Sequence, residues 1–429
     1  MPTLVLNECA SDARQPAWAS RRVQLAIVIL LVAAGVALRV ENLDGVAFRS
    51  PDEHSYTAEA GMLLQQGATG FSVLAAEQNR NPGLPGPTRA GYLLLLGRMM
   101  QLTGHRDEMA GAELSCAASI VSILLLALIT WRYFSPTVAM AAVMLYAVSP
   151  MALMTARRAW EESVVEALAL TLIAIACEIT AGSRSWGWSL LFALLGGFSI
   201  AVKEVATEGY VLCFAWILIV LLLRRERRQA ILFAGLCAGA SAAVVAWLAH
   251  LAGGFTIFAH QYTMTAKFLA GSPYSIAFEG GEPWRLLQAF WIVSATASVL
   301  SVAGMAYALS WRNGWVVRRQ IALALTLFLA IFMLVATMEP HHLNLRYVCP
   351  IFAPFYLLAG VGVYEVLQLL RRHLAETESR PLAAVLFATL ICGSGLDYYH
   401  FIRHFTAPEM QDLSIRMVVS AGGTDEPTQ

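Results

Sequence analysis

Long apolar runs alternate with short polar segments along almost the whole chain. A run of about 20 apolar residues is long enough to cross the hydrocarbon core of a membrane as a helix. About eleven runs recur, and the shorter ones can be accommodated as tilted or broken spans. They cover residues 23–40, 111–131, 137–154, 164–181, 187–202, 207–223, 230–251, 287–310, 320–338, 347–367 and 382–396. The pattern predicts an all-α polytopic membrane protein with about eleven transmembrane helices.

The remaining polar segments divide the chain into three predicted parts. Residues 1–22 form a cytoplasmic segment, residues 23–396 form one transmembrane domain, and residues 397–429 form a short C-terminal tail. Charged residues follow the first apolar run where a cleavage site would need small ones, so we interpret this run as an uncleaved anchor. The apolar stretch 92–102 is too short to cross the membrane and predicts an interfacial helix.

Basic residues between the apolar runs orient the chain in the membrane. Short cytoplasmic loops of membrane proteins are enriched in Lys and Arg. With the N-terminus inside, every basic cluster in a short loop lies inside except Arg157–Arg158. The loops that then face outward are 41–110, 155–163, 203–206, 252–286 and 339–346. The sequence therefore predicts a multi-pass protein of the cell (inner) membrane. Its functional site is expected on the outer, periplasmic face, with the first outer loop carrying part of it.

The composition agrees with this class of protein and excludes others. The chain is 58% hydrophobic and 14% charged, whereas about 25% of residues are charged in ordinary globular proteins. Its 29 basic and 29 acidic residues balance, so no overall field attracts nucleic acid. The seven cysteines stand singly and give no spacing typical of a disulfide framework or a zinc site. We therefore expect membrane lipids to surround the protein.

The first outer loop opens with a sequence that predicts a helix start. Ser50 is the expected N-cap, Pro51 the first helical residue, and Glu53 the residue that closes a capping box. The capping box accounts for a glutamate at position 53 as well as a catalytic role would. It does not require an aspartate at position 52. A carboxylate at a helix N-terminus suits a general base or a metal ligand. Tyr56 follows one turn later on the same face.

The order of the charged motifs resembles that of the GT-C membrane glycosyltransferases, the superfamily of dolichyl-phosphate-mannose protein mannosyltransferases and lipid A aminoarabinose transferases. The resemblance covers roughly residues 23–370. It rests on Pro51-Asp52-Glu53 with Tyr56, Arg157-Arg158-Ala159-Trp160-Glu161-Glu162-Ser163, Lys203-Glu204 after Gly196-Gly197, and Arg346-Tyr347 before Pro350 and Pro354. The segment 81–87 departs from the family pattern, so the resemblance does not extend to details of the acceptor loop.

The resemblance implies an enzyme that moves one sugar from a polyprenyl-phosphate donor to a lipid, glycan or protein acceptor, with inversion at the anomeric carbon. The leaving lipid phosphate requires fixed cations. The residues expected to bind it are Lys203, Arg346, Arg157 and Arg158. Pairing with nearby carboxylates is the alternative role for these cations, and lipid-headgroup binding is a further one for the two adjacent arginines.

The same resemblance implies catalytic carboxylates and further residues that line the site. Asp52 is the expected general base, Glu53 is the second candidate, and Glu162, with Glu161 as its alternative, is expected at the acceptor side. Asp52 and Glu162 would hold a divalent cation if the enzyme uses one. The other expected lining residues are Tyr56, Glu204, His341, His342 and Tyr347.

Two other functions fit parts of the pattern. A transporter or flippase for lipid-linked sugars needs polar groups near mid-membrane on several spans, whereas here they lie at outer span ends. A metal-dependent lipid-phosphate hydrolase would use His341, His342 and His54 as ligands. Adjacent histidines point to different faces of a helix, and the sequence contains no His-Glu-x-x-His spacing. The glycosyltransferase is the first hypothesis, and the transporter is the alternative.

Overall fold

The computed structural model describes most of the chain, and its secondary structure is helical apart from one isolated antiparallel bridge between Asn344 and Ser414. The described residues are 20–45, 49–82, 86–183, 185–279, 282, 284–310, 317–338, 343–406, 413–414 and 417–418. The all-α class predicted from the apolar runs is confirmed.

Eight helices in these ranges are long and apolar enough to cross a membrane. Two of them are extended by a short helical segment: the 3-10 turn η6 (Leu345–Ile351) precedes α16, and the π-helical η7 (Phe401–Phe405) follows α17. The eight are α1 (Arg21–Val40), α5 (Glu108–Tyr133), α8 (Glu162–Thr180), α10 (Glu204–Leu223), α11 (Arg227–Leu251), α15 (Val317–Met338), α16 (Phe352–His373) and α17 (Glu376–His400).

The expected count of eleven spans is not confirmed, because three apolar runs form shorter or broken helices. Two runs give the short helices α6 (Pro136–Ala147) and α9 (Trp186–Ile200). The third gives α13 (Arg285–Val293) and α14 (Ala295–Leu309), which meet at an angle of 115°. The hydroxyl of Ser294 accepts a hydrogen bond from the backbone N–H of Ala297 (3.3 Å) and starts α14 in its new direction.

The first outer loop folds into short helices. They are α2 (Pro51–Gln66), η2 (Gly67–Thr69), α3 (Gly70–Arg80), η3 (Gly86–Arg89) and α4 (Ala90–Thr103). The helix start predicted at Ser50 and the helix predicted over 92–102 are both observed. Two further outer-loop elements are α12 (Phe255–Gly271) and the π-helical η4 (Ser275–Glu279), and α7 (Pro150–Thr155) is a short helix after α6.

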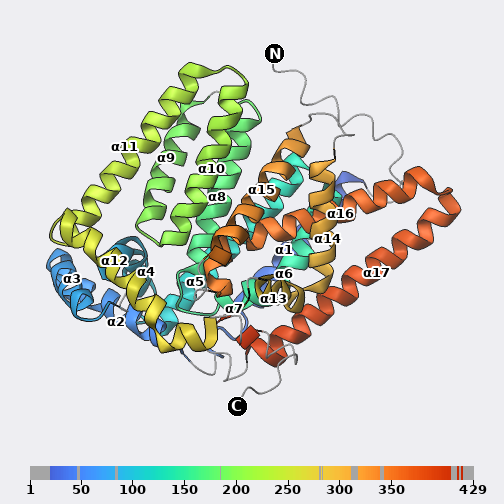
Figure 1. The fold of residues 1–429 in the computed structure, drawn as a ribbon. Coiled ribbons are helices and arrows are strands. Elements are labelled where there is room, and N and C mark those ends of the chain that lie inside the picture. Colours follow the sequence, from blue (N-terminus) through green and yellow to red (C-terminus); the bar gives the residue numbers. More distant parts are fainter. Residues whose placement is uncertain are drawn as a thin grey trace.

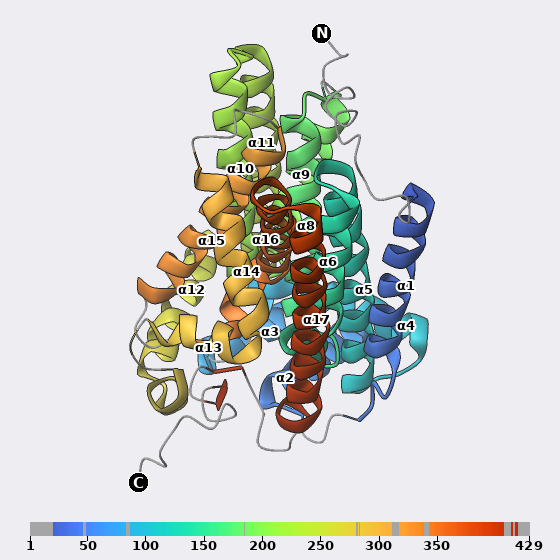
Figure 2. The same cartoon turned by 90° about the vertical axis from the view of Figure 1, so that its right-hand side faces the viewer.

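The helices are arranged around α8 and α16, the two most enclosed spans. Helices α8 to α11 pack together on one side of the molecule, while α14, α16 and α17 lie on the other (Figures 1 and 2). Helix α14 crosses α16 closely, because a Cβ on Gly304 or Gly362 would collide with the facing backbone. Most side chains of α1, α11 and α17 face outward.

The arrangement separates the predicted inner and outer segments. The basic turn between α10 and α11, residues 224–228, lies at one end of the molecule, and α2 and α3 lie at the other end (Figure 1). The elements that bear the candidate site residues therefore meet at the end opposite this turn. The N-terminal ends of α2, α8, α10 and η6 supply them.

Candidate active site

Asp52 and Glu53 begin α2 but have different surroundings. The backbone N–H of Ser50 donates to Glu53 Oε2 (2.7 Å), as the predicted capping box requires. The indole N–H of Trp160 donates to Ser50 Oγ (2.9 Å) and so links this cap to the loop before α8. The Asp52 side chain is 54% exposed, whereas that of Glu53 is fully buried.

Glu53 holds the loop before α8 against the start of α2. Its carboxylate accepts hydrogen bonds from the backbone N–H of Ala159 (2.8 Å) and the guanidinium of Arg158 (2.9 Å). A third donor is Arg49, at 3.1 Å. A buried carboxylate with this many donors has little capacity left for a substrate. The position of Glu53 is therefore that of a structural junction between two parts of the chain.

Arg157 and Arg158 also point into the protein. Arg157 donates to the backbone carbonyls of Leu38 (2.7 Å), in the last turn of α1, and of Asn42 (3.0 Å), just after it. Its guanidinium lies over the ring of Phe401. Arg158 is 3% exposed and forms its ion pair with Glu53. Arg158 borders on the group formed by Lys203 and Arg346, because the guanidinium groups of Arg158 and Arg346 lie 4.9 and 4.4 Å from the centre of the same Trp160 ring.

The centre of the site is formed by two adjacent carboxylates and two cations from distant parts of the chain. Lys203 Nζ lies 2.6 Å from Glu162 Oε1 and 2.9 Å from Glu161 Oε1. Arg346 Nε donates to the same oxygen of Glu162 (2.8 Å), and its Nη1 donates to Asp52 Oδ2 (2.8 Å). Arg346 thus joins the fully buried carboxylate of Glu162 to the half-exposed carboxylate of Asp52.

A third cation, Arg89 at the end of η3, completes this group. Its Nη1 lies 2.7 Å from Glu161 Oε1, and its Nη2 lies 3.5 Å from Glu204 Oε2. Tyr56 donates its phenolic hydrogen to the same oxygen of Glu161 (2.7 Å), and Arg89 also contacts the Tyr56 hydroxyl. We define the site cluster as Asp52, Tyr56, Arg89, Glu161, Glu162, Lys203, Glu204 and Arg346.

Aromatic rings lie next to the cations of the site cluster. The guanidinium of Arg346 lies 4.4 Å from the ring centre of Trp160, and Lys203 Nζ lies 5.5 Å from that of Tyr347. Both distances are within the range of cation–π attraction, which is stronger away from water. Trp160 is fully buried. These rings limit the directions in which the two cations can move.

Burial and opposite charge set the protonation of the innermost pair. Burial alone would raise the pKa of Glu161, but Lys203, Arg89 and Arg346 outweigh it and hold that pKa well below its ordinary value. Burial would lower the pKa of Lys203, but Glu161 and Glu162 outweigh it and raise that pKa. Both groups are therefore charged across the physiological pH range, and the carboxylate holds the ammonium group in place.

Comparisons with known proteins agree with the helical fold described above. Residues 90–251 match the family model of dolichyl-phosphate-mannose-protein mannosyltransferase. ArnT from Cupriavidus metallidurans, solved with undecaprenyl phosphate, superposes with a TM-score of 0.59 at 14% identity, over 92% of this chain and 76% of ArnT. The protein has the GT-C glycosyltransferase fold.

A second solved GT-C structure shares most of the chain as well. The oligosaccharyltransferase from Archaeoglobus fulgidus, in its apo form, superposes with a TM-score of 0.62 at 12% identity, over 93% of this chain. This chain spans only 57% of that larger protein. No curated protein sequence matches the chain.

An apolar groove of about 500 Å³ approaches the site cluster of this GT-C chain. It lies between α10, α11, α12 and α15, and Glu204 stands in its wall beside aliphatic and aromatic side chains. Those lining side chains include Ile200, Val211, Phe258, Tyr262 and Phe332. Because Glu204 also contacts Arg89, the groove leads from an apolar surface to the charged cluster.

The two carboxylates expected to hold a divalent cation face a guanidinium in this GT-C structure. Asp52 and Glu162 are bridged by Arg346. In the described part of the chain, no three His, Cys, Asp or Glu side chains are grouped as metal ligands. The other predicted ligands, His341 and His342, lie outside the described residues. The cation observed between these carboxylates is thus the arginine side chain.

Arg89 is the site residue that the sequence analysis missed. It lies just after the segment 81–87, which departs from the GT-C pattern, and precedes the apolar helix α4. The available signal was topological, since Arg89 is a basic residue on the predicted outer side, where positive charge is unusual. Lys203 was singled out by the same signal.

Proposed function

We propose that the protein transfers a sugar from a polyprenyl-phosphate donor to an acceptor hydroxyl at the outer face of the cell membrane. One observation carries the proposal: Lys203, Arg346 and Arg89 meet around Glu161 and Glu162, beside an apolar groove. A lipid phosphate has the matching chemistry, an anionic head on an apolar chain. Two proteins of similar fold support this class of ligand. ArnT was solved with undecaprenyl phosphate, and AglB, the oligosaccharyltransferase from Archaeoglobus fulgidus, was solved with an inhibitory peptide and a dolichol-phosphate.

The three cations act on the leaving group. As the bond between the anomeric carbon and the phosphate oxygen breaks, negative charge grows on the polyprenyl phosphate. Preorganised cations in a partly buried site stabilise such charge more than water does. Glu161 and Glu162 hold Lys203 and Arg346 in place at 2.6–2.9 Å before the donor arrives. The polyprenyl chain would then extend along the groove beside Glu204.

Asp52 acts on the acceptor. It is the most exposed carboxylate of the site cluster, at the N-terminal end of α2, and its Oδ2 is held by Arg346. In the reaction, the acceptor oxygen forms a bond with the anomeric carbon, the carbon–phosphate oxygen bond breaks, and the acceptor proton passes to Asp52. Such a positioned base contributes about 10²–10⁴-fold to the rate.

Two sets of residues have different roles in this proposal. Lys203, Arg346 and Arg89 contact the phosphate, whereas Arg157 and Arg158 support the loop between α7 and α8. Glu53 belongs to the supporting set, because its oxygens accept from the loop and from Ser50. A transporter of lipid-linked sugars would not need Asp52 as a base, and this difference separates the two functions.

The test compares cells that lack the gene with cells that carry the wild-type chain or Asp52→Asn. Mass spectrometry of envelope glycans and lipids should show one glycosylated product in the wild type that is missing in the deletion and strongly reduced in Asp52→Asn. Purified wild-type protein should release polyprenyl phosphate from a labelled donor when an extract containing the acceptor is added. Normal product in Asp52→Asn cells would contradict the assignment of Asp52. Sugar-donor transport without release of polyprenyl phosphate would favour the transporter.

A further inference from the structure

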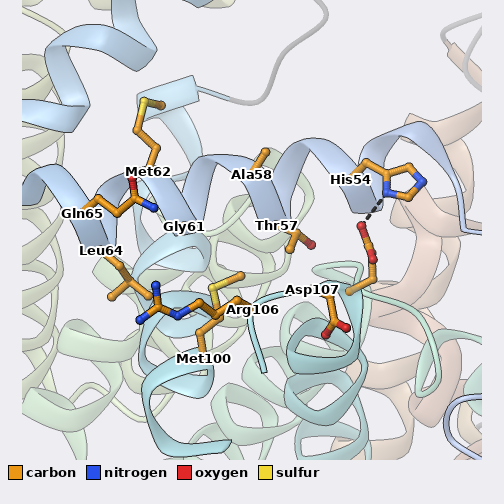
Figure 3. Close-up of a pocket in the computed structure, with 11 residues that line it drawn as sticks. His54, Thr57, Ala58, Gly61, Met62, Leu64, Gln65, Met100, Arg106 and Asp107 are labelled. Carbon is orange, nitrogen blue, oxygen red and sulfur yellow. Dashed lines mark hydrogen bonds and ion pairs between the residues drawn. The ribbon is translucent and has the colours of Figure 1, made fainter. Parts of the chain in front are cut away.

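A second cavity, of about 500 Å³, lies beside α2 and apart from the site cluster (Figure 3). Its walls are one face of α2 and the turn between α4 and α5. Gly61 lines it, and this residue is nine positions after Asp52 in the same helix. At 3.6 residues per turn, the two residues point in directions about 180° apart. The cavity and Asp52 therefore lie on opposite faces of one helix.

Polar side chains line the cavity from both walls. His54 from α2 and Glu108 from α5 form a hydrogen bond across one end, through His54 Nδ1 and Glu108 Oε1 (Figure 3). Asp107 Oδ1 accepts from the backbone N–H of Met109 (3.2 Å), so Asp107 serves as N-cap of α5. Each carboxylate thus uses one oxygen in these contacts. Its second oxygen accepts no hydrogen bond from the residues that the structure describes.

The cavity holds one arginine beside two carboxylates, whereas three cations meet in the site cluster. Arg106 lies beside Leu64 and Met100, whereas Asp107 lies toward His54, which is paired with Glu108 (Figure 3). A phosphate would find no group of cations here. The described residues also offer no set of three metal ligands. The lining favours a ligand that is uncharged and rich in hydroxyl groups, which carboxylate and amide oxygens bind through hydrogen bonds.

The rest of the lining suits the same ligand. Ala58 and Gly61 leave room at the helix surface, while Leu64 and Met100 supply apolar atoms. The volume falls within the range of about 300–1,000 Å³ that is typical of small-molecule sites. A sugar ring presents hydroxyl groups at its edge and C–H groups on its faces. The cavity matches both.

We propose that this cavity binds one saccharide unit of the acceptor, so that the acceptor contacts both faces of α2. The proposal of a saccharide site depends only on the lining of the cavity. Its assignment to the acceptor rests on the proposed transferase function. The reacting hydroxyl lies at Asp52, and the unit bound in the cavity is separated from it along the acceptor. This names a glycan or glycolipid as the acceptor class.

Gly61 allows a substitution that fills the cavity without disturbing the fold. A Cβ built on Gly61 meets no heavy atom within 4 Å. Gly61 lies inside α2, where replacement of glycine favours the helix by about 1 kcal/mol. Gly235 in α11 is a matched control, because it is also helical and its Cβ also meets nothing within 4 Å. Gly61→Leu and Gly235→Leu therefore make the same chemical change at two distant places.

The first measurement is saturation-transfer NMR on the purified full-length protein in lipid nanodiscs. The probes are methyl glycosides of mannose, glucose, galactose and N-acetylglucosamine at millimolar concentration. At least one should bind to the wild type and to Gly235→Leu. Its binding should weaken about tenfold or more in Gly61→Leu, and clearly in Glu108→Gln, which removes a carboxylate but keeps the shape. Absence of binding by every probe, or equal binding by Gly61→Leu and Gly235→Leu, would overturn the site.

The second measurement separates this inference from the proposed function. Polyprenyl-phosphate binding by Gly61→Leu should equal that of the wild type, because Gly61 is not in the site cluster, while the amount of glycosylated product in cells should fall. Glycoside binding that is lost in Gly61→Leu with full product formation would contradict the acceptor assignment. If the wild type binds glycosides but has no transferase activity, the proposed function and the acceptor assignment both fail, although the saccharide site itself remains.

Discussion

Arg346 and Asp52 form a 2.8 Å ion pair although 294 positions separate them in the sequence. The pair connects η6, which precedes α16, with the first turn of α2. Arg346 is nearly buried and also holds Glu162, whereas Asp52 is half exposed. A phosphate that approaches Arg346 therefore arrives next to the proposed base. In the proposed function, the two members of this ion pair act on the donor phosphate and on the acceptor hydroxyl.

Asp52 and Glu53 should respond oppositely to removal of their charge. Asp52→Asn should lower the transfer rate by two or more orders of magnitude with little change in the melting temperature. Glu53→Gln should lower the free energy of unfolding by about 3 kcal/mol, because Arg158 and Arg49 lose a buried ionic partner. Turnover and thermal unfolding of both purified variants provide the check. A larger loss of folding stability in Asp52→Asn than in Glu53→Gln would contradict the assigned roles.

Arg89 should be required for donor binding. Arg89→Ala removes a cation from Glu161 and Glu204 and from the proposed phosphate position. We expect the dissociation constant for polyprenyl phosphate to rise about 30-fold or more, equivalent to about 2 kcal/mol. Arg98→Ala is the control, since Arg98 is exposed on the same segment and bonds only to Gln101 among the described residues. Equal affinities of the two variants would exclude Arg89 from the donor site.

Lys203 should make the stability of the site independent of pH over a wide range. The pKa of Glu161 is lowered, so its contribution is present above about pH 4.5 and is lost only as the pH falls further. The pKa of Lys203 is raised, so its contribution is present below about pH 10.5 and is lost above that. Between these limits the pair adds no pH dependence.

Lys203→Met should introduce such a dependence. Burial would then act on Glu161 with less opposing positive charge and raise its pKa relative to the wild type. Because burial is the largest single influence on this carboxyl group, we expect its pKa to pass above the unfolded value near 4.5. The variant should then lose stability as the pH rises from 5 to 9, in addition to any loss seen in the wild type. Melting temperatures of wild type and variant over this range provide the measurement. Parallel curves would show that Lys203 is not the main counter-charge of Glu161.

Glu59 is expected to cause a pH dependence of its own. Burial raises its pKa to about 8, against the opposing effects of the Gly86 backbone and Arg89. A carboxyl group whose pKa is raised on folding stabilises the protein below its unfolded value, near 4.5, and this stabilisation is lost as the pH rises to about 8. Glu59→Gln should therefore flatten the fall in melting temperature between pH 5 and 8. An unchanged slope in this variant would contradict the assignment.

The predicted orientation can be tested by labelling single cysteines in intact cells. A cysteine at Ser72, exposed on α3, should react with an impermeant maleimide from outside. A cysteine at Gln229, at the start of α11, should react only after the cells are opened. The background should carry Cys9→Ser and Cys392→Ser, because Cys392 is the exposed thiol among the described cysteines. The reverse labelling pattern would invert the topology.

The sequence predicted those parts of the fold and the site that depend on local patterns. Apolar length predicted the long helices, and Ser50 with Pro51 predicted the start of α2. Charge at the ends of apolar runs marked Glu162, Lys203 and Arg346 as candidate site residues. The structure brings these three side chains together. These residues stand out because charge near a membrane needs a specific reason.

Other features depend on tertiary contacts that no local pattern contains. The apolar run 287–310 does not predict its 115° bend. A single serine, Ser294, starts the second helix there, and one serine is not a distinctive sequence pattern. Arg158 and Lys203 look alike in the sequence as basic residues at outer span ends. Only the fold shows that one faces Glu53 and the other faces Glu161 and Glu162. Pairing between distant charges is decided by packing.

The C-terminal residues also reach the outer layer of the protein. The backbone N–H of Leu345 donates to the carbonyl of Leu413 (2.9 Å), directly beside Arg346. During synthesis at about 5–20 residues per second, Asp52 leaves the ribosome roughly 15–60 s before Arg346 does. The segment at Leu413 emerges later still. The site cluster is therefore completed only after α15 has been synthesised, and a ribosome that stalls there would leave a membrane-inserted protein that has no Arg346.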